Sequence, residues 1–98
     1  MDMQAATKVL RERVGSDSGL GTTLKLDCGS EGKVLIDGTA NPNTVSNHDG
    51  DAACTIALSL DTLGRLILRE LEPTTAFMMG KIKVSGDMSV ALKLQNLL

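Results

Sequence analysis

The chain has 98 residues, of which 42% are hydrophobic and 22% charged, and its formal net charge at pH 7 is −2. This length supports one hydrophobic core, so we expect a single domain over residues 1–98. Outside a local group in the first predicted helix the basic residues do not cluster, and Phe77 is the one aromatic residue. This composition argues against nucleic-acid binding, which needs phosphate-neutralising cations or stacking rings.

The N-terminus and the cysteines indicate a cytoplasmic location. The opening stretch MDMQAATKVLRERV mixes acidic and basic residues and has no apolar run, so it is not a signal peptide. No stretch approaches the ~20 apolar residues of a membrane span. Cys28 and Cys54 each fall in a predicted strand and are expected to be free thiols in a reducing compartment. We therefore expect a soluble cytoplasmic protein.

The first predicted element is an amphipathic helix over residues 3–14, ended by Gly15. Apolar side chains recur on one side of it at helical spacing: Met3, Ala6, Leu10 and Val14. The glycine- and serine-rich stretch 15–22 follows. It lacks the Lys-Ser/Thr ending of a phosphate-binding loop and is expected to be a flexible connection.

Four short strands with alternating polarity are predicted next. The runs 24–28 and 33–38 flank the turn sequence GSEG, which indicates a hairpin. A third strand is expected near Val45, and a polar turn at 49–51 precedes the fourth. The fourth strand has four apolar side chains on one face: Cys54, Ile56, Leu58 and Leu60.

The apolar period then changes from two to about 3.6, which predicts a helix. Either Asp61 or Thr62 is expected to cap its start, and Pro73 is expected to end it. Its buried stripe is predicted to consist of Leu63, Leu66, Ile67 and Leu71. One further short helical turn is expected over residues 74–77.

Residues 81–86 return to strand periodicity, and a last helix runs from Met88 to the end with Asp87 as its N-cap. The fifth strand follows a helical crossover, which allows it to pair parallel with an earlier strand. The element order predicts an α+β fold, with a five-stranded, mostly antiparallel sheet and helices packed on one face.

The residues offer little for catalysis. His48 lies beside two aspartates in a polar turn, where an exposed side chain is the simple reading and a metal-binding or acid–base role is the alternative. Alternation places the thiols of Cys28 and Cys54 on the apolar face, which raises the pKa of a thiol rather than activating it. We therefore expect no enzyme, no cofactor and no bound metal.

The last predicted helix has two apolar faces. Met88, Ala91, Leu92, Gln95 and Leu98 share one face, and Val90, Leu94 and Leu97 share the other. A helix of this kind needs two apolar neighbours. One is the sheet, and the other is a second helix, a partner chain or a bound apolar molecule.

These residues resemble the sterol carrier protein 2 domain family. The stretch LEPTTAFMMGKIKVSGDMSVALKLQNLL, from Leu71 to the end, is similar to the family's C-terminal pattern of L-x-P, A-F-M-x-G-K-[IL]-K-[IV]-x-G-[DN]-M and A-x-K-L-Q. Upstream, LKLDCGSEGKVLIDG resembles the family's first hairpin, and ACTIALSLDTLGRLI resembles a strand followed by a helix. The resemblance covers nearly the whole chain.

The resemblance implies a hydrophobic tunnel between sheet and helices that takes fatty acids, fatty acyl-CoA, sterols or phospholipids, and no catalytic residues. The lipid-binding positions it implies are Phe77, Met78, Ile82, Val84, Met88, Leu92, Gln95 and Leu98. Gln95 would contact the polar end of the ligand. Transient contact with a membrane surface is compatible with this function.

Two features depart from the family pattern. Arg69 and Glu70 stand where a Gly-Lys-like step is common, which alters the expected tunnel mouth, and the early strands lack aromatic residues. The alternative function is therefore a structural or protein-interaction module whose cavity is filled and which dimerises or docks a partner. The sequence leaves the oligomeric state and the identity of the lipid open.

Overall fold

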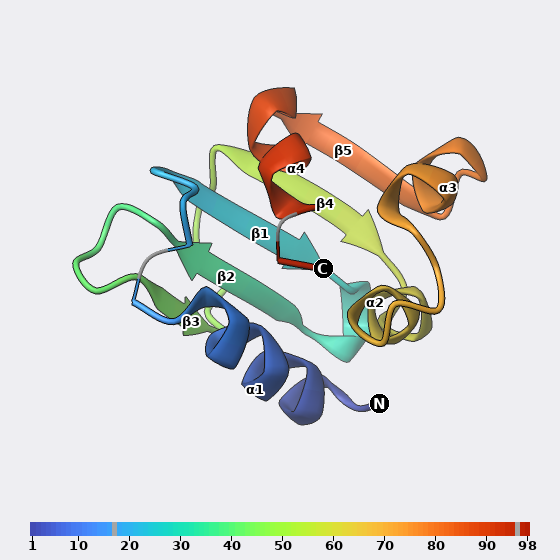
Figure 1. The fold of residues 1–98 in the computed structure, drawn as a ribbon, viewed down its shortest axis with the longest axis horizontal. Helices are drawn as coiled ribbons and strands as arrows, with labels where there is room; N and C mark the ends of the chain where they lie inside the picture. Colours follow the sequence, from blue (N-terminus) through green and yellow to red (C-terminus); the bar gives the residue numbers. More distant parts are fainter. Residues whose placement is uncertain (17, 96) are drawn as a thin grey trace.

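A five-stranded mixed sheet forms the centre of the molecule (Figure 1), which is known from a computed structural model that describes residues 1–16, 18–95 and 97–98. Within these residues the strands are β1 (Thr23–Asp27), β2 (Lys33–Asp37), β3 (Thr44–Ser46), β4 (Cys54–Leu58) and β5 (Ile82–Gly86). The helices are α1 (Met3–Val14), η1 (Gly29–Glu31), α2 (Leu60–Ile67), α3 (Pro73–Met78) and α4 (Met88–Leu94). The α+β class predicted from the sequence is confirmed.

The strand order is β3-β2-β1-β4-β5, and the one parallel pair in this described sheet joins β1 to β4. The expectation of a parallel fifth strand was wrong, because β5 pairs antiparallel with β4. The connection between β3 and β4 makes the crossover instead. It carries Asp49 to Lys25 of β1, where the carboxylate and Nζ are 3.0 Å apart, and it brings Gly50 against Leu35 of β2.

The core lies on one face of the sheet, where α1 and α4 pack in Figure 1. Alternation along the strands sends one set of side chains to this face: Leu24, Leu26, Val34, Ile36, Cys54, Ile56 and Leu58 are all buried. The opposite face carries polar side chains along β1 and β2, with Leu35 as the one apolar residue that these two described strands place there. The polar residues are Thr23, Lys25, Asp27, Lys33 and Asp37. The predicted division into one apolar and one polar face is therefore confirmed.

The predicted first helix is confirmed at both ends. Asp2 is its N-cap, and Oδ1 accepts a hydrogen bond from the backbone N–H of Ala5 at 2.8 Å. Gly15 follows with a φ of 60°, in the left-handed region that suits glycine.

The second helix begins and ends earlier than predicted. Its N-cap is Ser59, whose Oγ accepts a hydrogen bond from the N–H of Thr62 at 3.0 Å, so neither Asp61 nor Thr62 is the cap. It ends at Ile67, which leaves Leu71 outside the helix. Pro73 begins α3 instead of ending α2, because the first turn of a helix does not require the N–H that proline lacks.

The turn between β5 and α4 fixes the course of the last helix. Gly86 has a φ of 93°, and a Cβ there would lie 2.3 Å from the carbonyl oxygen of Ala53, so only glycine fits. The next residue, Asp87, donates its N–H to that oxygen and caps α4 by accepting from the N–H of Ser89, as predicted. The helix ends at Leu94, short of the predicted end at Leu98.

Candidate functional site

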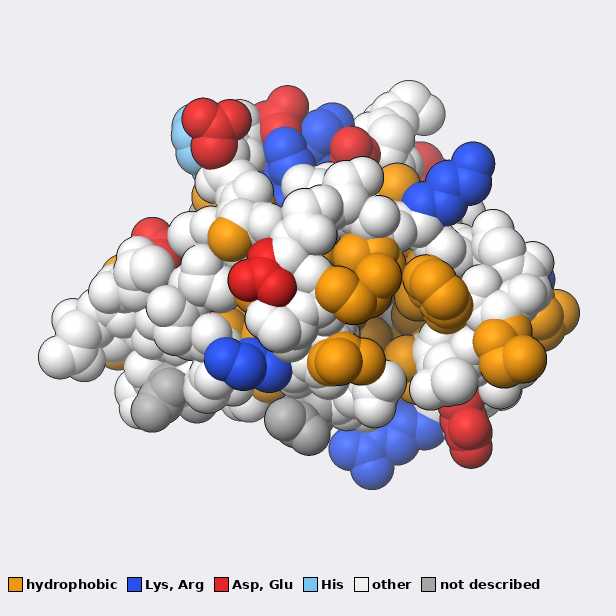
Figure 2. Space-filling model, turned by 90° about the horizontal axis from the view of Figure 1, so that it is seen from above, with side chains coloured by type: hydrophobic (Ala, Val, Ile, Leu, Met, Phe, Trp, Pro, Cys, Tyr) orange, Lys and Arg blue, Asp and Glu red, His pale blue; other side chains and the backbone are white. Residues whose placement is uncertain are grey.

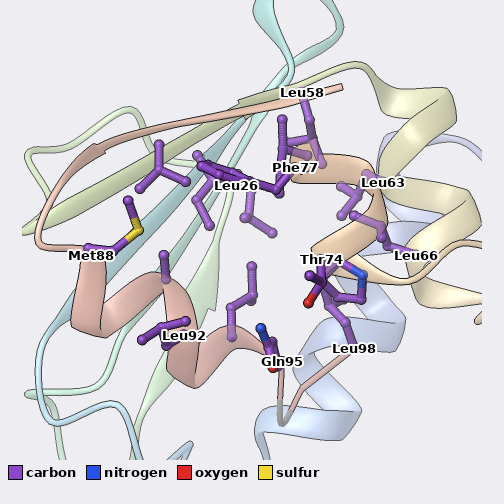
Figure 3. Close-up of a pocket in the computed structure, with 16 residues that line it drawn as sticks. Leu26, Leu58, Leu63, Leu66, Thr74, Phe77, Met88, Leu92, Gln95 and Leu98 are labelled. Carbon is purple, nitrogen blue, oxygen red and sulfur yellow. The ribbon is translucent and has the colours of Figure 1, made fainter. Parts of the chain in front are cut away.

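An apolar cavity of about 210 Å³ lies between the sheet and the helices α2, α3 and α4 (Figure 3). The sheet contributes Leu26, Ile56, Leu58, Ile82 and Val84. The helices and the segments next to them contribute Leu63, Leu66, Pro73, Thr74, Phe77, Met88, Ala91, Leu92, Leu94, Gln95 and Leu98. Only Thr74 and Gln95 in this lining have polar side chains, so the cavity is suited to an apolar guest.

The last helix uses its two apolar faces differently, as the sequence predicts for a helix with two apolar neighbours. Val90 and Leu94 are buried against the core, with Leu94 also bordering the cavity, and Leu97 just beyond the helix is buried too. The residues of the other face line the cavity: Met88, Ala91, Leu92, Gln95 and Leu98. The second neighbour of this face is therefore the cavity rather than another helix of the described chain.

Seven of the eight sequence-predicted site residues line the cavity, and Met78 does not. Its side chain is 81% exposed on the outside of α3, because the helical turn that directs Phe77 into the cavity turns the next residue away.

Several residues that line the cavity are not predicted as site residues from the sequence. Leu26, Ile56 and Leu58 were assigned to the apolar face of the sheet, and the parallel pairing of β1 with β4 brings them under α4. Pro73 and Thr74 lie at the start of α3. From the sequence, Pro73 is expected to end the preceding helix and Thr74 to begin a short helical turn, so neither is predicted as a site residue. Ala91 carried a usable signal, because it shares the helical face of Met88 and Leu92.

An exposed apolar rim borders the mouth of the cavity and continues onto the outside of α3. Figure 2 shows hydrophobic side chains gathered around a hollow on the face formed by β5, α3 and α4. We define the rim by its large exposed apolar residues: Phe77, Met78, Met79, Met88 and Leu92. Phe77, Met88 and Leu92 also line the cavity, so the rim is continuous with its interior.

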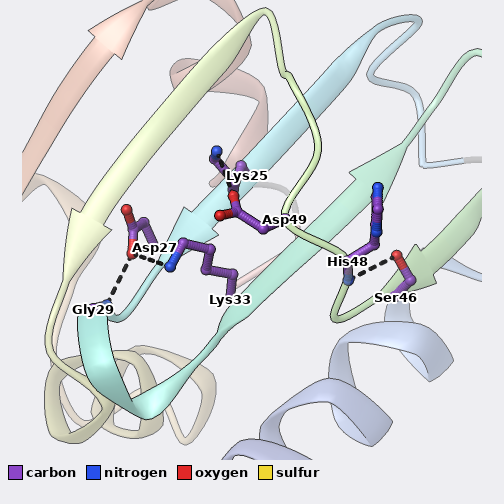
Figure 4. Close-up of polar contacts among 7 residues, drawn as sticks. All are labelled: Lys25, Asp27, Gly29, Lys33, Ser46, His48 and Asp49. Atoms are coloured by element: carbon purple, nitrogen blue, oxygen red, sulfur yellow. Dashed lines mark hydrogen bonds and ion pairs between the residues drawn. The ribbon is translucent and has the colours of Figure 1, made fainter.

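The other residues singled out for chemistry lie on the opposite side of the sheet or inside the core. His48 is exposed, and its backbone N–H donates to Ser46 Oγ at 3.4 Å (Figure 4). Nearby, Lys33 and Asp27 form a 3.6 Å ion pair. Among the described residues, no group of three or more His, Cys, Asp or Glu side chains is placed to hold a metal ion.

Both thiols are free and buried, and burial raises the pKa of each. For Cys28 the pKa rises to about 11, mainly through burial and further through the charges of Glu31 and Asp27. For Cys54 burial is again the largest cause. This direction agrees with the sequence prediction and keeps both thiols protonated near neutral pH.

The fold and the cavity define a class of small α+β domain in which an apolar cavity lies between one face of a sheet and the helices that cover it. The sequence matches the SCP-2 sterol transfer family over residues 3–98. The chain belongs to this family, as the resemblance indicated. Membership assigns it, in general terms, to lipid-binding and lipid-transfer domains.

Individual relatives agree with this assignment. Sterol carrier protein 2 of Gallus gallus is 40% identical over 70 residues, which are 70% of this chain and 13% of that protein. SCP2-L2 of Aedes aegypti has the same fold with a TM-score of 0.78 at 18% identity, covering 97% of this chain and 94% of that one. The palmitated SCP2L2 of Aedes aegypti gives a TM-score of 0.76 at 19% identity, covering 99% and 94%.

The chain spans only 13% of the length of its sterol carrier protein 2 relatives. The similarity therefore concerns this domain and not the remainder of those proteins. Within the described residues, no helix combines the length and the apolar character needed to cross a membrane.

Proposed function

We propose that residues 1–98 form one domain that binds a lipid in the apolar cavity and carries it between lipid surfaces. The observation that carries this proposal is the outer face of α4, where Met88, Ala91 and Leu92 line the cavity and the large side chains of Met88 and Leu92 stay half-exposed. A fatty acid, fatty acyl-CoA, sterol or phospholipid would place its apolar part there. The relative described as palmitated supports an acyl chain as one such guest.

Free energy favours such a complex without any catalytic group. Removal of an acyl chain from water contributes about 0.8 kcal/mol for each CH₂ group, so ~16 carbons give on the order of 12 kcal/mol before the costs of ordering and association. The cavity of about 210 Å³ is smaller than the ~300–1,000 Å³ of typical ligand sites. The half-exposed side chains of Met88 and Leu92 at its mouth can move outward to enlarge it.

The rim suits a protein that collects its ligand from a membrane surface. Met78 is 81% exposed and Met79 60% exposed, and neither lines the cavity. Exposed apolar side chains of this size mark surfaces that meet an apolar partner. We propose that the rim inserts shallowly into a lipid surface while the ligand enters, in a cytoplasmic protein that contacts membranes transiently.

The same rim also fits the alternative function of a module that dimerises or docks a protein partner. Sedimentation at increasing concentration distinguishes the two functions. A carrier is expected to stay monomeric when free of ligand, whereas a dimerising module would associate through the rim and would bind no lipid.

Ligand binding is tested by native mass spectrometry of the freshly purified protein and by displacement of a fluorescent fatty acid. The informative variant is Ala91→Phe, because the added ring would occupy the cavity from α4. We expect at least tenfold weaker binding, equivalent to about 1.4 kcal/mol. The matched control is Ala5→Phe, at an exposed position of α1, which should bind as the unaltered protein does.

Absence of bound or displacing ligand among fatty acids, acyl-CoA and sterols would refute the carrier function. Equal binding by Ala91→Phe and the unaltered protein would show that the ligand lies elsewhere. Thermal unfolding of both variants confirms that they are folded before binding is compared.

A further inference from the structure

A second cavity adjoins the apolar one at the end away from Met88. It has a volume of about 390 Å³ and shares part of its wall with the first cavity: Leu66, Pro73, Gln95 and Leu98 line both. Its remaining lining adds charge, because it includes Arg69 and Glu72 beside Leu71. The apolar cavity is therefore adjoined by a second cavity whose lining includes charged side chains.

The polar groups of the first cavity lie at this shared end. Figure 3 shows Thr74 and Gln95 on the same side of the lining as Leu98, with Met88 on the opposite side. An amphipathic molecule whose chain fills the apolar cavity would therefore have its polar end near Gln95 and facing the second cavity. Taken together, the two volumes fall within the range of ligand sites.

Arg69 differs from the other three arginines of the chain. Arg11 donates to the carbonyl of Val45, and Arg13 donates to the carbonyls of Ile67 and Leu97. Arg65 pairs with Asp61 at 3.2 Å. The guanidinium of Arg69 has no hydrogen-bond or ion-pair partner among the residues that the structure describes.

The backbone at Arg69 strengthens this contrast. Its φ of 61° lies in the left-handed region, and no other non-glycine residue of the described chain has a positive φ. At the end of a helix this conformation is usually supplied by glycine, and a side chain such as arginine there costs about 1 kcal/mol. The arginine is therefore not explained by the requirements of the turn.

We propose that the second cavity is a head-group site and that Arg69 selects ligands with a single anionic head, such as the carboxylate of a fatty acid. Its guanidinium supplies charge-assisted hydrogen bonds to the carboxylate, while Glu72 on the same cavity opposes heads that carry several negative charges. The inference rests on the proposed lipid binding and adds the identity of the head group.

The test compares two ligands with the same chain and different heads, dodecanoate and dodecanol, by displacement of a fluorescent fatty acid at pH 7.5. We expect the unaltered protein to bind dodecanoate about three- to tenfold more tightly, as suits one charge-assisted contact at a partly exposed site. In Arg69→Gly this preference should disappear while dodecanol binding is unchanged. Glycine suits the backbone at this position, so the variant should fold.

The matched control is Arg65→Gln, an exposed arginine one turn earlier that lines neither cavity. It should keep the preference for dodecanoate. Glu72→Gln should bind dodecanoate more tightly, because the opposing carboxylate is removed. Since the Glu72 side chain makes no capping hydrogen bond to α3, this change should leave the helix intact.

The negative results of this test distinguish failure of the head-group site from failure of lipid binding. If both ligands bind equally well to the unaltered protein, or if Arg69→Gly keeps the preference, the head-group site is refuted and lipid binding stands. A loss of the preference in Arg65→Gln as well would attribute it to general charge and would also refute the site. If neither ligand binds, the proposed function fails and the head-group site fails with it.

Discussion

Cys28 is a buried residue whose thiol has a raised pKa although it does not line the apolar cavity. It follows β1 directly and is only 6% exposed, which is the main reason that its pKa rises to about 11. The nearby carboxylates of Glu31 and Asp27 raise the pKa further. The consequence is a thiol that is inert at neutral pH despite its position one residue from a turn.

The reactivity of Cys28 provides the first prediction. At pH 8 a thiol with a pKa of about 11 has roughly 100-fold less thiolate than one with the ordinary value of 9.0. Alkylation by iodoacetamide, followed by peptide mass spectrometry, should therefore be at least that much slower in the native protein than in urea. A native rate equal to the unfolded rate would contradict the burial of this thiol.

The same residue predicts a pH dependence of stability. Because the folded pKa of Cys28 is raised, the folded state holds this proton more tightly than the unfolded state does. The contribution of Cys28 to stability is complete below about pH 9 and is lost as the pH rises toward about 11. Urea unfolding at pH 8 and pH 10.5 should show the loss, and Cys28→Ala should reduce it.

At the scale of secondary-structure elements, the boundaries were harder to predict than the elements themselves. Alternation through Ser59 and Leu60 continues the pattern of β4, so the sequence predicts a strand up to residue 60. The structure begins α2 at Leu60, because Ser59 Oγ satisfies the free N–H of Thr62. Local periodicity cannot distinguish an outward strand residue from a cap.

The cap of α2 gives a matched pair of substitutions. Ser59→Ala removes the acceptor for the N–H of Thr62 and should lower the free energy of unfolding by about 1 kcal/mol. Asp61→Ala, at the position expected from the sequence, removes only an exposed ion pair with Arg65 and should cost about 0.5 kcal/mol or less. Urea denaturation measures both, and a larger loss for Asp61→Ala would reverse the assignment of the cap.

At the scale of the whole molecule, the composition of the site depended on how distant segments meet. The two faces of α4 could be predicted from the sequence because their spacing is local. The parallel pairing of β1 with β4, which adds Leu26 to the cavity, depends on a connection that crosses the open face through Asp49 and Gly50. The adjoining charged cavity likewise requires α2 to end early, and only the packed structure shows this.

The rim predicts a difference between binding and transfer. The double variant Met78→Ser, Met79→Ser removes exposed apolar side chains that do not line the cavity. We expect unchanged affinity for a fluorescent fatty acid in solution and at least threefold slower transfer from lipid vesicles, because shallow insertion is weakened.

The matched control for the rim is Leu68→Ser, since Leu68 is 58% exposed and lies outside both the rim and the apolar cavity. Its transfer rate should equal that of the unaltered protein. If the double variant transfers the ligand from vesicles as fast as the unaltered protein does, the ligand exchanges through the solvent and the rim does not contact membranes.

The residues that line the cavity are unevenly distributed along the chain. Leu26 is the one lining residue of the described chain before Ile56; all others lie within residues 56–98. Substitutions in α1, β2 and β3 can therefore alter how firmly the scaffold holds together while the shape offered to a ligand stays the same. If the proposed lipid binding holds, substitutions that change ligand preference are expected mainly within residues 56–98.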